Sequence, residues 1–371
     1  MADDWKRRID RLHENLVRRD DPAAWVTEAD AVEASYRYPD LLVRGPVFGL
    51  AAQNTGDGGH GGHGGKRRPG APRAERGSTA GPWRDGGENG GWRLLRPVSG
   101  GTPQEARDSL NSFLWFRAKD DTDDPRLRRT LLDAVAVLEN EPVNEVEVLG
   151  CRYRVVRADE FARRGEDGME PPRPTDPEPG NDYSWEGGRG REWPEVGLTI
   201  DPDRDEGLMA GAMKLGLRSF TYNGALYPDQ VRRDSELAVE HYPDIALLPV
   251  GFSLAELADG QWTPRGALLP SPHDARRALF DGMNEFWPMM YRFDPARRAA
   301  HARAAAEFKA AGRADEARVG DVLYRVCRIE RAVRCGPDGP EPPRPSDLDS
   351  WGPMKLHPTM DDDGTLHYDE G

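Results

Sequence analysis

Apolar residues along this chain recur at two spacings, which predict helices that alternate with strands. In residues 102–119 and 125–138 they recur every three or four positions, and a Thr or Asp followed by Pro starts each segment. We therefore expect two capped helices there. Apolar and polar residues alternate over 144–161 around a Leu-Gly turn, which predicts a hairpin. Residues 41–53 predict a further strand, and residues 2–20 an N-terminal helix with one apolar face.

The same pattern occurs twice in the chain. Tyr153–Asp176 and Tyr324–Asp347 align without gaps, and both contain Glu-Pro-Pro-Arg-Pro near their ends. Each residue of the second segment therefore differs in number from its counterpart in the first by the same amount, the difference between Tyr153 and Tyr324. We call this difference the repeat offset. Upstream, Trp92 corresponds to Trp262, each next to a predicted strand. A register kept over this length predicts an internal duplication.

This pattern predicts an α+β protein of two homologous repeats related by a pseudo-twofold axis. Each repeat is expected to form a mainly antiparallel four-stranded sheet with helices packed on one face. A disordered Gly-rich insertion at 54–91 interrupts the first repeat, where the second has only a tight Asp-Gly turn. The predicted units are an N-terminal helix (1–21), the first repeat (22–179), a linker with a connecting strand-helix-strand (180–227), the second repeat (228–349) and a mobile acidic tail (350–371).

Composition narrows the functional classes. The net charge is −14, the pI about 5.2 and the mean hydropathy −0.77. These values predict a soluble protein and argue against nucleic-acid binding, which needs a basic surface. No apolar stretch is long enough for a membrane span, and the charged N-terminus lacks the apolar core of a signal peptide. Three cysteines without a Cys-x-x-Cys spacing are typical of a reducing compartment, so we expect a cytoplasmic protein.

The sequence offers no catalytic, cofactor-binding or metal-ligating set. The glycine tract departs from a phosphate-binding loop, because His60 stands where the first Gly is needed and Arg67 where Ser or Thr is needed. His60 and His63 lack the further ligands of a metal site. The cysteines do not align between the repeats; Cys335, for example, corresponds to Arg164. We expect no cofactor, and we expect the protein not to be an enzyme.

The repeated Glu-Pro-Pro-Arg-Pro segments are the one polar feature shared by both repeats. Arg173 and Arg344 are therefore the candidate partner-binding residues, presented to an acidic protein on an extended Pro-rich arm. The alternative is that each arm packs along its own sheet edge and protects it. Sequence reasoning favours this packing alternative, and it leaves the oligomeric state open.

Segments of the chain resemble an uncharacterised family of streptomycetes and related actinobacteria that is classified as a domain of unknown function. The resemblance lies in VTEADAVEASYRYPDLLVRGPVFGLAAQ, GTPQEARDSLNSFLWFRAKDD, NEVEVLGCRYRVVRADEF and GPDGPEPPRPSD. It covers most of the chain, but not residues 54–90 or the tail. The resemblance implies a soluble cytosolic protein and brings no catalytic residues.

These observations favour a cytoplasmic, non-enzymatic interaction or regulatory protein built from a duplicated α+β module. The alternative is a small-molecule-binding protein or enzyme with its site in the groove between the two repeats. A pocket lined by polar groups from both repeats would favour this alternative. An interface filled with side chains would favour the interaction protein.

Overall fold

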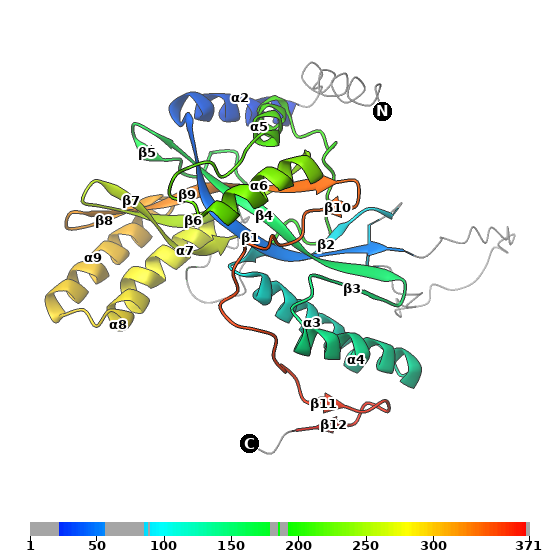
Figure 1. Cartoon of the computed structure of the whole chain (residues 1–371). Helices are drawn as coiled ribbons and strands as arrows, with labels where there is room; N and C mark the ends of the chain where they lie inside the picture. The colour runs from blue at the N-terminus through cyan, green and yellow to red at the C-terminus, as the bar shows by residue number, and fades with distance from the viewer. Residues whose placement is uncertain (1–21, 56–84, 88–89, 179–184, 186–191, 369–371) are drawn as a thin grey trace, which may run out of the picture.

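The computed structural model describes residues 22–55, 85–87, 90–178, 185 and 192–368 (Figure 1). The predicted N-terminal helix and most of the Gly-rich insertion lie outside these residues. The helices are α2 (Pro22–Arg37), α3 (Pro103–Asp120), α4 (Pro125–Asn140), α5 (Leu208–Arg218), α6 (Asp229–His241), α7 (Pro272–Asp281), α8 (Trp287–Met290) and α9 (Pro295–Ala311). The strands are β1 (Asp40–Asn54), β2 (Arg93–Gly100), β3 (Glu145–Val148), β4 (Cys151–Gly165), β5 (Gly168–Met169), β6 (Asp244–Ala258), β7 (Gln261–Leu269), β8 (Glu316–Val319), β9 (Val322–Gly336), β10 (Gly339–Pro340), β11 (Thr359–Met360) and β12 (Leu366–His367).

Local sequence signals account for where these elements begin and turn. The hydroxyl of Thr102 accepts a hydrogen bond from the Glu105 amide at the start of α3, and Ser271 does the same for Asp274 at the start of α7. These caps satisfy amide groups that lack partners inside the helix. The predicted tight turn at Asp259–Gly260 is confirmed, because both residues have positive φ angles, 51° and 76°. Such angles are the signature of a two-residue hairpin turn.

Strands β1 to β10 form one 10-stranded antiparallel sheet, with β2-β1-β4-β9-β6-β7 as its main order. A mixed helix-and-strand protein with antiparallel pairing is thus confirmed, but the two halves share a sheet, whereas a four-stranded sheet in each repeat was predicted. The junction is the pairing of β4 with β9, where Glu160 lies opposite Arg331. These two residues are themselves separated by the repeat offset. We call residues 22–179 the first half and residues 228–349 the second half.

The two faces of this sheet differ in what covers them. On the helix face, Tyr153 and Val155 of β4 pack against α3 and α4, and Tyr324 and Val326 of β9 pack against α7 and α9. Figure 1 shows these two helix groups at opposite ends of the sheet. On the other face, called the linker face, alternate residues such as Val156 form separate apolar clusters. Residues 193–200, which connect the halves, pack against these clusters through Trp193 and Ile200.

The C-terminal segment, predicted to be a mobile acidic tail, lies against α3 and α4. The His357 ring stacks on Trp115 of α3 at a centroid distance of 4.5 Å, and the Trp115 indole N–H donates to the Pro358 carbonyl at 3.2 Å. Met360 is buried in the cluster under α3 and α4. The acidic run that follows suggested mobility, but these aromatic and apolar residues hold residues 350–368 against the helices.

The end of the predicted disordered insertion also belongs to the fold. Asp85 is 6% exposed, and its carboxylate accepts hydrogen bonds from the Tyr153 hydroxyl at 2.7 Å and from Arg117 Nη2 at 2.8 Å. Residues 85–87 therefore form part of the first half, although the sequence around them is rich in glycine. Within the described residues, no helix has the length and apolar character that a membrane crossing needs.

Candidate functional site

Two Pro-rich arms connect the halves reciprocally. The first arm, residues 170–176, starts on β4, where the Glu170 amide donates to the Arg163 carbonyl. The Glu170 carbonyl in turn accepts a hydrogen bond of 2.9 Å from the Arg328 amide of β9. The second arm, residues 341–347, starts on β9 and accepts from the Arg157 amide of β4 at 2.9 Å through the Glu341 carbonyl. Each arm therefore begins on the long strand of its own half and continues along the long strand of the other.

The candidate partner-binding residues Arg173 and Arg344 lie at the same place in the two arms. Arg173 Nε donates to Glu170 Oε1 at 2.6 Å, and Arg344 Nε donates to Glu341 Oε1 at 2.6 Å. The two side chains are 12% and 5% exposed. A partner would have to displace these internal carboxylates. The surroundings agree with the packing alternative, and partner binding through these residues stays a prediction.

The second arm closes over a buried group of charges on the helix face. Arg157 contacts Asp159 at 2.9 Å and Asp347 at 3.0 Å, and the Tyr222 hydroxyl donates to Asp159 at 2.5 Å. Burial opposes ionisation of Asp159, yet Arg157 and Arg344 beside it keep the pKa of its carboxyl below the ordinary value. A paired carboxylate of this kind fixes the arm to the sheet.

We expect Arg344→Ala to lower the free energy of unfolding by about 2–3 kcal/mol, because it leaves Glu341 buried without its charged donor. Arg173→Ala should cost less, since Arg173 is more exposed. Urea denaturation measures both changes, and Arg129→Ala is the control because its side chain is 70% exposed. If neither arm variant loses stability, the arms are not packing elements and partner binding regains support.

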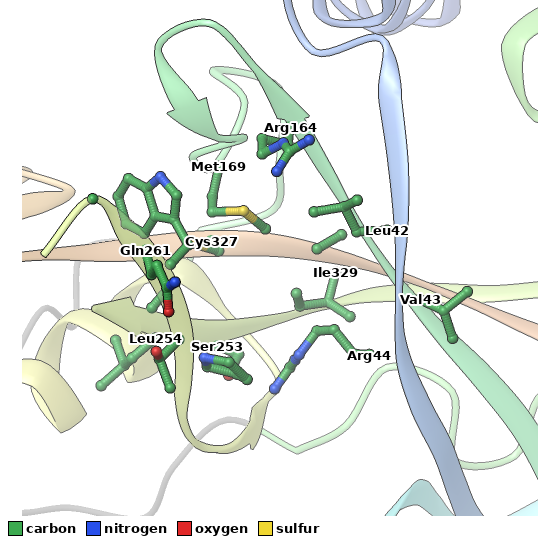
Figure 2. Close-up of a pocket in the computed structure, with 16 residues that line it drawn as sticks. Leu42, Val43, Arg44, Arg164, Met169, Ser253, Leu254, Gln261, Cys327 and Ile329 are labelled. Atoms are coloured by element: carbon green, nitrogen blue, oxygen red, sulfur yellow. The ribbon is translucent and has the colours of Figure 1, made fainter. Parts of the chain in front are cut away.

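A cavity of about 470 Å³ opens on the linker face, between strands of the two halves (Figure 2). Leu42 and Ala162 come from β1 and β4 of the first half, and Trp262, Cys327 and Ile329 from β7 and β9 of the second. Its volume falls in the range of small-molecule sites, which are mostly apolar with a few placed polar groups. The cavity is therefore the candidate functional site.

The polar side chains in this largely apolar wall include Arg44, Arg164 and Ser253. Among the residues that the structure describes, no hydrogen-bond partner reaches the buried Nη1 of Arg44 or the buried hydroxyl of Ser253. Arg44 approaches Glu160, with 3.5 Å between Nη1 and Oε2. Burial raises the pKa of the Glu160 carboxyl, and the nearby Arg44 lowers it only in part. Buried polar atoms without partners are rare, and they mark a place where a ligand or water can bind.

Comparison with known proteins places the chain in a family. A family model described as "Family of unknown function (DUF5954)" matches residues 21–350, which include both halves and every residue of the cavity wall. The chain belongs to this family. No curated protein and no solved structure matches it.

The cavity wall of this DUF5954 protein carries groups that can contact a ligand. Cys327 lines the cavity, but burial raises the pKa of its thiol to about 12, so the nucleophilic thiolate is scarce at neutral pH. Over the described ranges, no three His, Cys, Asp or Glu side chains are placed to hold a metal ion. What the wall offers a ligand is apolar contact together with guanidinium and hydroxyl groups.

Sequence reasoning missed Arg44 and Ser253 in this DUF5954 protein. Both lie inside strands with ordinary strand patterns, and only the pairing of the two halves brings them to one cavity. One signal was visible: Arg164 corresponds to Cys335 in the other half. A charged residue and a small apolar one at matched positions indicate that the two halves differ there.

Proposed function

We propose that the halves are two copies of one module and that the protein binds a small molecule in the cavity between them. The supporting observation is that strands of both halves line the cavity, together with buried polar atoms that make no hydrogen bond to the described residues. A pocket lined by polar groups from both halves is the observation that favours a small-molecule-binding protein over an interaction protein. The proposal includes a cytoplasmic location and no catalytic step.

The duplication is supported by contacts that recur at the repeat offset. Arg154 Nη1 donates to the carbonyls of Asp338 and Pro340, and Arg325 Nη1 donates to those of Asp167 and Met169. The two donors are separated by the repeat offset, and each binds the hairpin of the other half. Two modules joined in this way create a shared wall, and small-molecule sites occur preferentially at such interfaces.

The test is to fill the cavity from its rim. Pro264 of β7 lines the cavity, is exposed and lies opposite Ala255, which belongs to the apolar cluster in the cavity wall, so Pro264→Trp adds volume at the rim without disturbing the core. The probes are 4-phenyl-1-butanol, 4-phenylbutyrate and 4-phenylbutylamine, which share an apolar body and differ in their end group. We expect at least one probe to bind the wild-type protein at one site in isothermal titration calorimetry, and Pro264→Trp to weaken its binding at least about tenfold.

The control is Arg318→Trp, which adds the same side chain at an exposed position of β8 outside the cavity wall. It should bind the probe as the wild-type protein does. If no probe binds the wild-type protein, or if Pro264→Trp binds as tightly as the control, the cavity is not a ligand site.

A further inference from the structure

The cavity has a counterpart in the first half, and that counterpart is filled. There, Trp92 and Val156 belong to a buried cluster with Ala51, and Ile200 of the segment between the halves packs against it. The same segment follows the edge of β2: the Ile200 amide donates to the Trp92 carbonyl at 2.8 Å. The first half thus uses its own chain to cover this apolar surface.

Matched residues identify the two places as equivalent. Trp262 stands in the cavity wall where Trp92 stands in the filled cluster, and Cys327 and Ile329 follow Val156 and Ala158 at the repeat offset. Trp193 packs against the apolar cluster whose residues also form the cavity wall, but the segment then runs across the sheet through Glu195, which pairs with Arg331, toward the first half. Among the described residues, no segment occupies the cavity as Ile200 occupies its counterpart.

The cavity wall is more polar than the filled cluster of the first half at three matched positions. Asp40 pairs with Arg164 and Asp244 with Cys335, so Arg164 takes the place of a buried cysteine. Arg44 follows Asp40 by the same number of residues as Leu248 follows Asp244, so these two positions correspond. Leu248 is part of the filled cluster. Gly49 and Ser253 are likewise matched, and they pair with Val156 and Cys327. Where the chain fills the surface itself, it uses apolar or small residues. Where the surface stays open, it carries two guanidinium groups and a hydroxyl.

From this difference we propose that the ligand of the cavity is an organic anion, a carboxylate on an apolar body, with its carboxylate held by Arg44. This inference rests on the proposed function. A guanidinium presents paired N–H donors that match a carboxylate, and its attraction for an anion grows where water is excluded. Ser253 adds a hydroxyl that is 1% exposed and without a partner among the described residues. In Figure 2 the Arg44 guanidinium points toward the side of the cavity where Ser253 lies.

The neighbouring carboxylates engage Arg44 and Arg164 differently. Arg44 forms an ion pair with Glu160 at 3.5 Å, but its Nη1 makes no hydrogen bond and keeps its donors for a second carboxylate. Arg164 is 3.1 Å from Asp40, and both side chains are about half exposed, so solvent and Asp40 already satisfy it. The apolar body of the ligand would lie along Trp262, Ile329 and Met169, which line the same cavity. Arg44 therefore determines which ligand charge the cavity prefers, and the apolar wall determines the affinity for the apolar body of the ligand.

The experiment compares the three phenylbutyl probes on the full-length wild-type protein by isothermal titration calorimetry. We expect 4-phenylbutyrate to bind at least about tenfold more tightly than 4-phenyl-1-butanol, and 4-phenylbutylamine to bind more weakly than the alcohol. Equal binding of the acid and the alcohol would overturn the anion inference and leave the proposed function intact. Absence of binding by all three would overturn the proposed function itself.

Variants at Arg44, with Arg129→Gln as the control, then test whether Arg44 causes the preference for the acid. Arg44→Gln should lower the affinity for 4-phenylbutyrate at least about tenfold and change that for the alcohol less than about twofold, whereas Arg129→Gln should change neither. Arg44→Lys keeps the charge and provides the comparison if Arg44→Gln is poorly folded by circular dichroism; it should retain the acid over the alcohol with a smaller ratio. An undiminished preference for the acid in a folded Arg44→Gln protein would contradict the role of Arg44.

Discussion

Glu195→Ala is expected to lower the free energy of unfolding by about 3–5 kcal/mol, because it leaves a charged guanidinium buried without its counter-ion. Arg331 and Glu195 are both 0% exposed, and two hydrogen bonds of 2.6 and 3.0 Å join them. Arg331 also donates to the Val98 and Pro249 carbonyls, so it cannot turn toward solvent without breaking contacts on both sides of the sheet junction. Chemical denaturation followed by circular dichroism measures the loss.

The double variant Glu195→Leu with Arg331→Met is the control. If the cost of Glu195→Ala comes from the unpaired charge, removal of both charges should recover most of the lost stability. If the double variant is as unstable as the single one, the cost comes from packing of the segment between the halves. A loss below about 1 kcal/mol in Glu195→Ala would mean that water reaches Arg331 and compensates it.

Gly339→Ala is expected to lower the free energy of unfolding by about 2–5 kcal/mol. Gly339 has a φ of 104°, and a Cβ placed on it would lie 2.0 Å from the indole nitrogen of Trp92 in the other half. The change combines backbone strain of about 1–2 kcal/mol with an overpacked contact of about 1–3 kcal/mol. Thermal or urea unfolding measures the total.

The chain offers a matched control in Gly312, which also has a positive φ, 73°, but no atom within 4 Å of the added Cβ. Gly312→Ala should show the backbone cost alone, and the difference between the two variants gives the cost of the contact with Trp92. Gly168 meets Trp262 in the reciprocal hairpin, with an added Cβ at 2.6 Å, so Gly168→Ala should behave like Gly339→Ala. Equal losses in all three variants would show that the contacts between halves do not matter.

Much of the local structure could be predicted from the sequence, because local rules decide it. The helix caps at Thr102 and Ser271 and the turn at Asp259–Gly260 each depend on a few adjacent residues. One local prediction is wrong: the second strand of the predicted connecting strand-helix-strand would span residues 217–223, whereas α5 runs to Arg218 and the following residues are irregular. Phe220 in this stretch packs against Phe161 of β4. This contact depends on the tertiary structure and leaves no trace in the local pattern.

The shared sheet and the cavity could not be predicted, since they depend on contacts between residues far apart in the chain. Nothing in the pattern of β4 says that its partner is β9 and not a strand of its own half. The cavity depends on this pairing, because it brings Ala162 of the first half beside Ile329 of the second. The position of the tail was missed for a similar reason: stacking of His357 on Trp115 joins the end of the chain to a helix of the first half.

The pairing of β4 with β9 has a consequence for how the protein can fold as it is synthesised. Glu160 leaves the ribosome long before Arg331, which opposes it in the sheet. At cellular rates of synthesis this delay is on the order of 10 s. During that time β4 has β1 and β3 beside it but an open edge along residues 158–162, and the apolar residues there are exposed. The nascent first half therefore carries an unpaired strand edge of the kind that favours mispairing, and the sheet can be completed only after β9 has emerged.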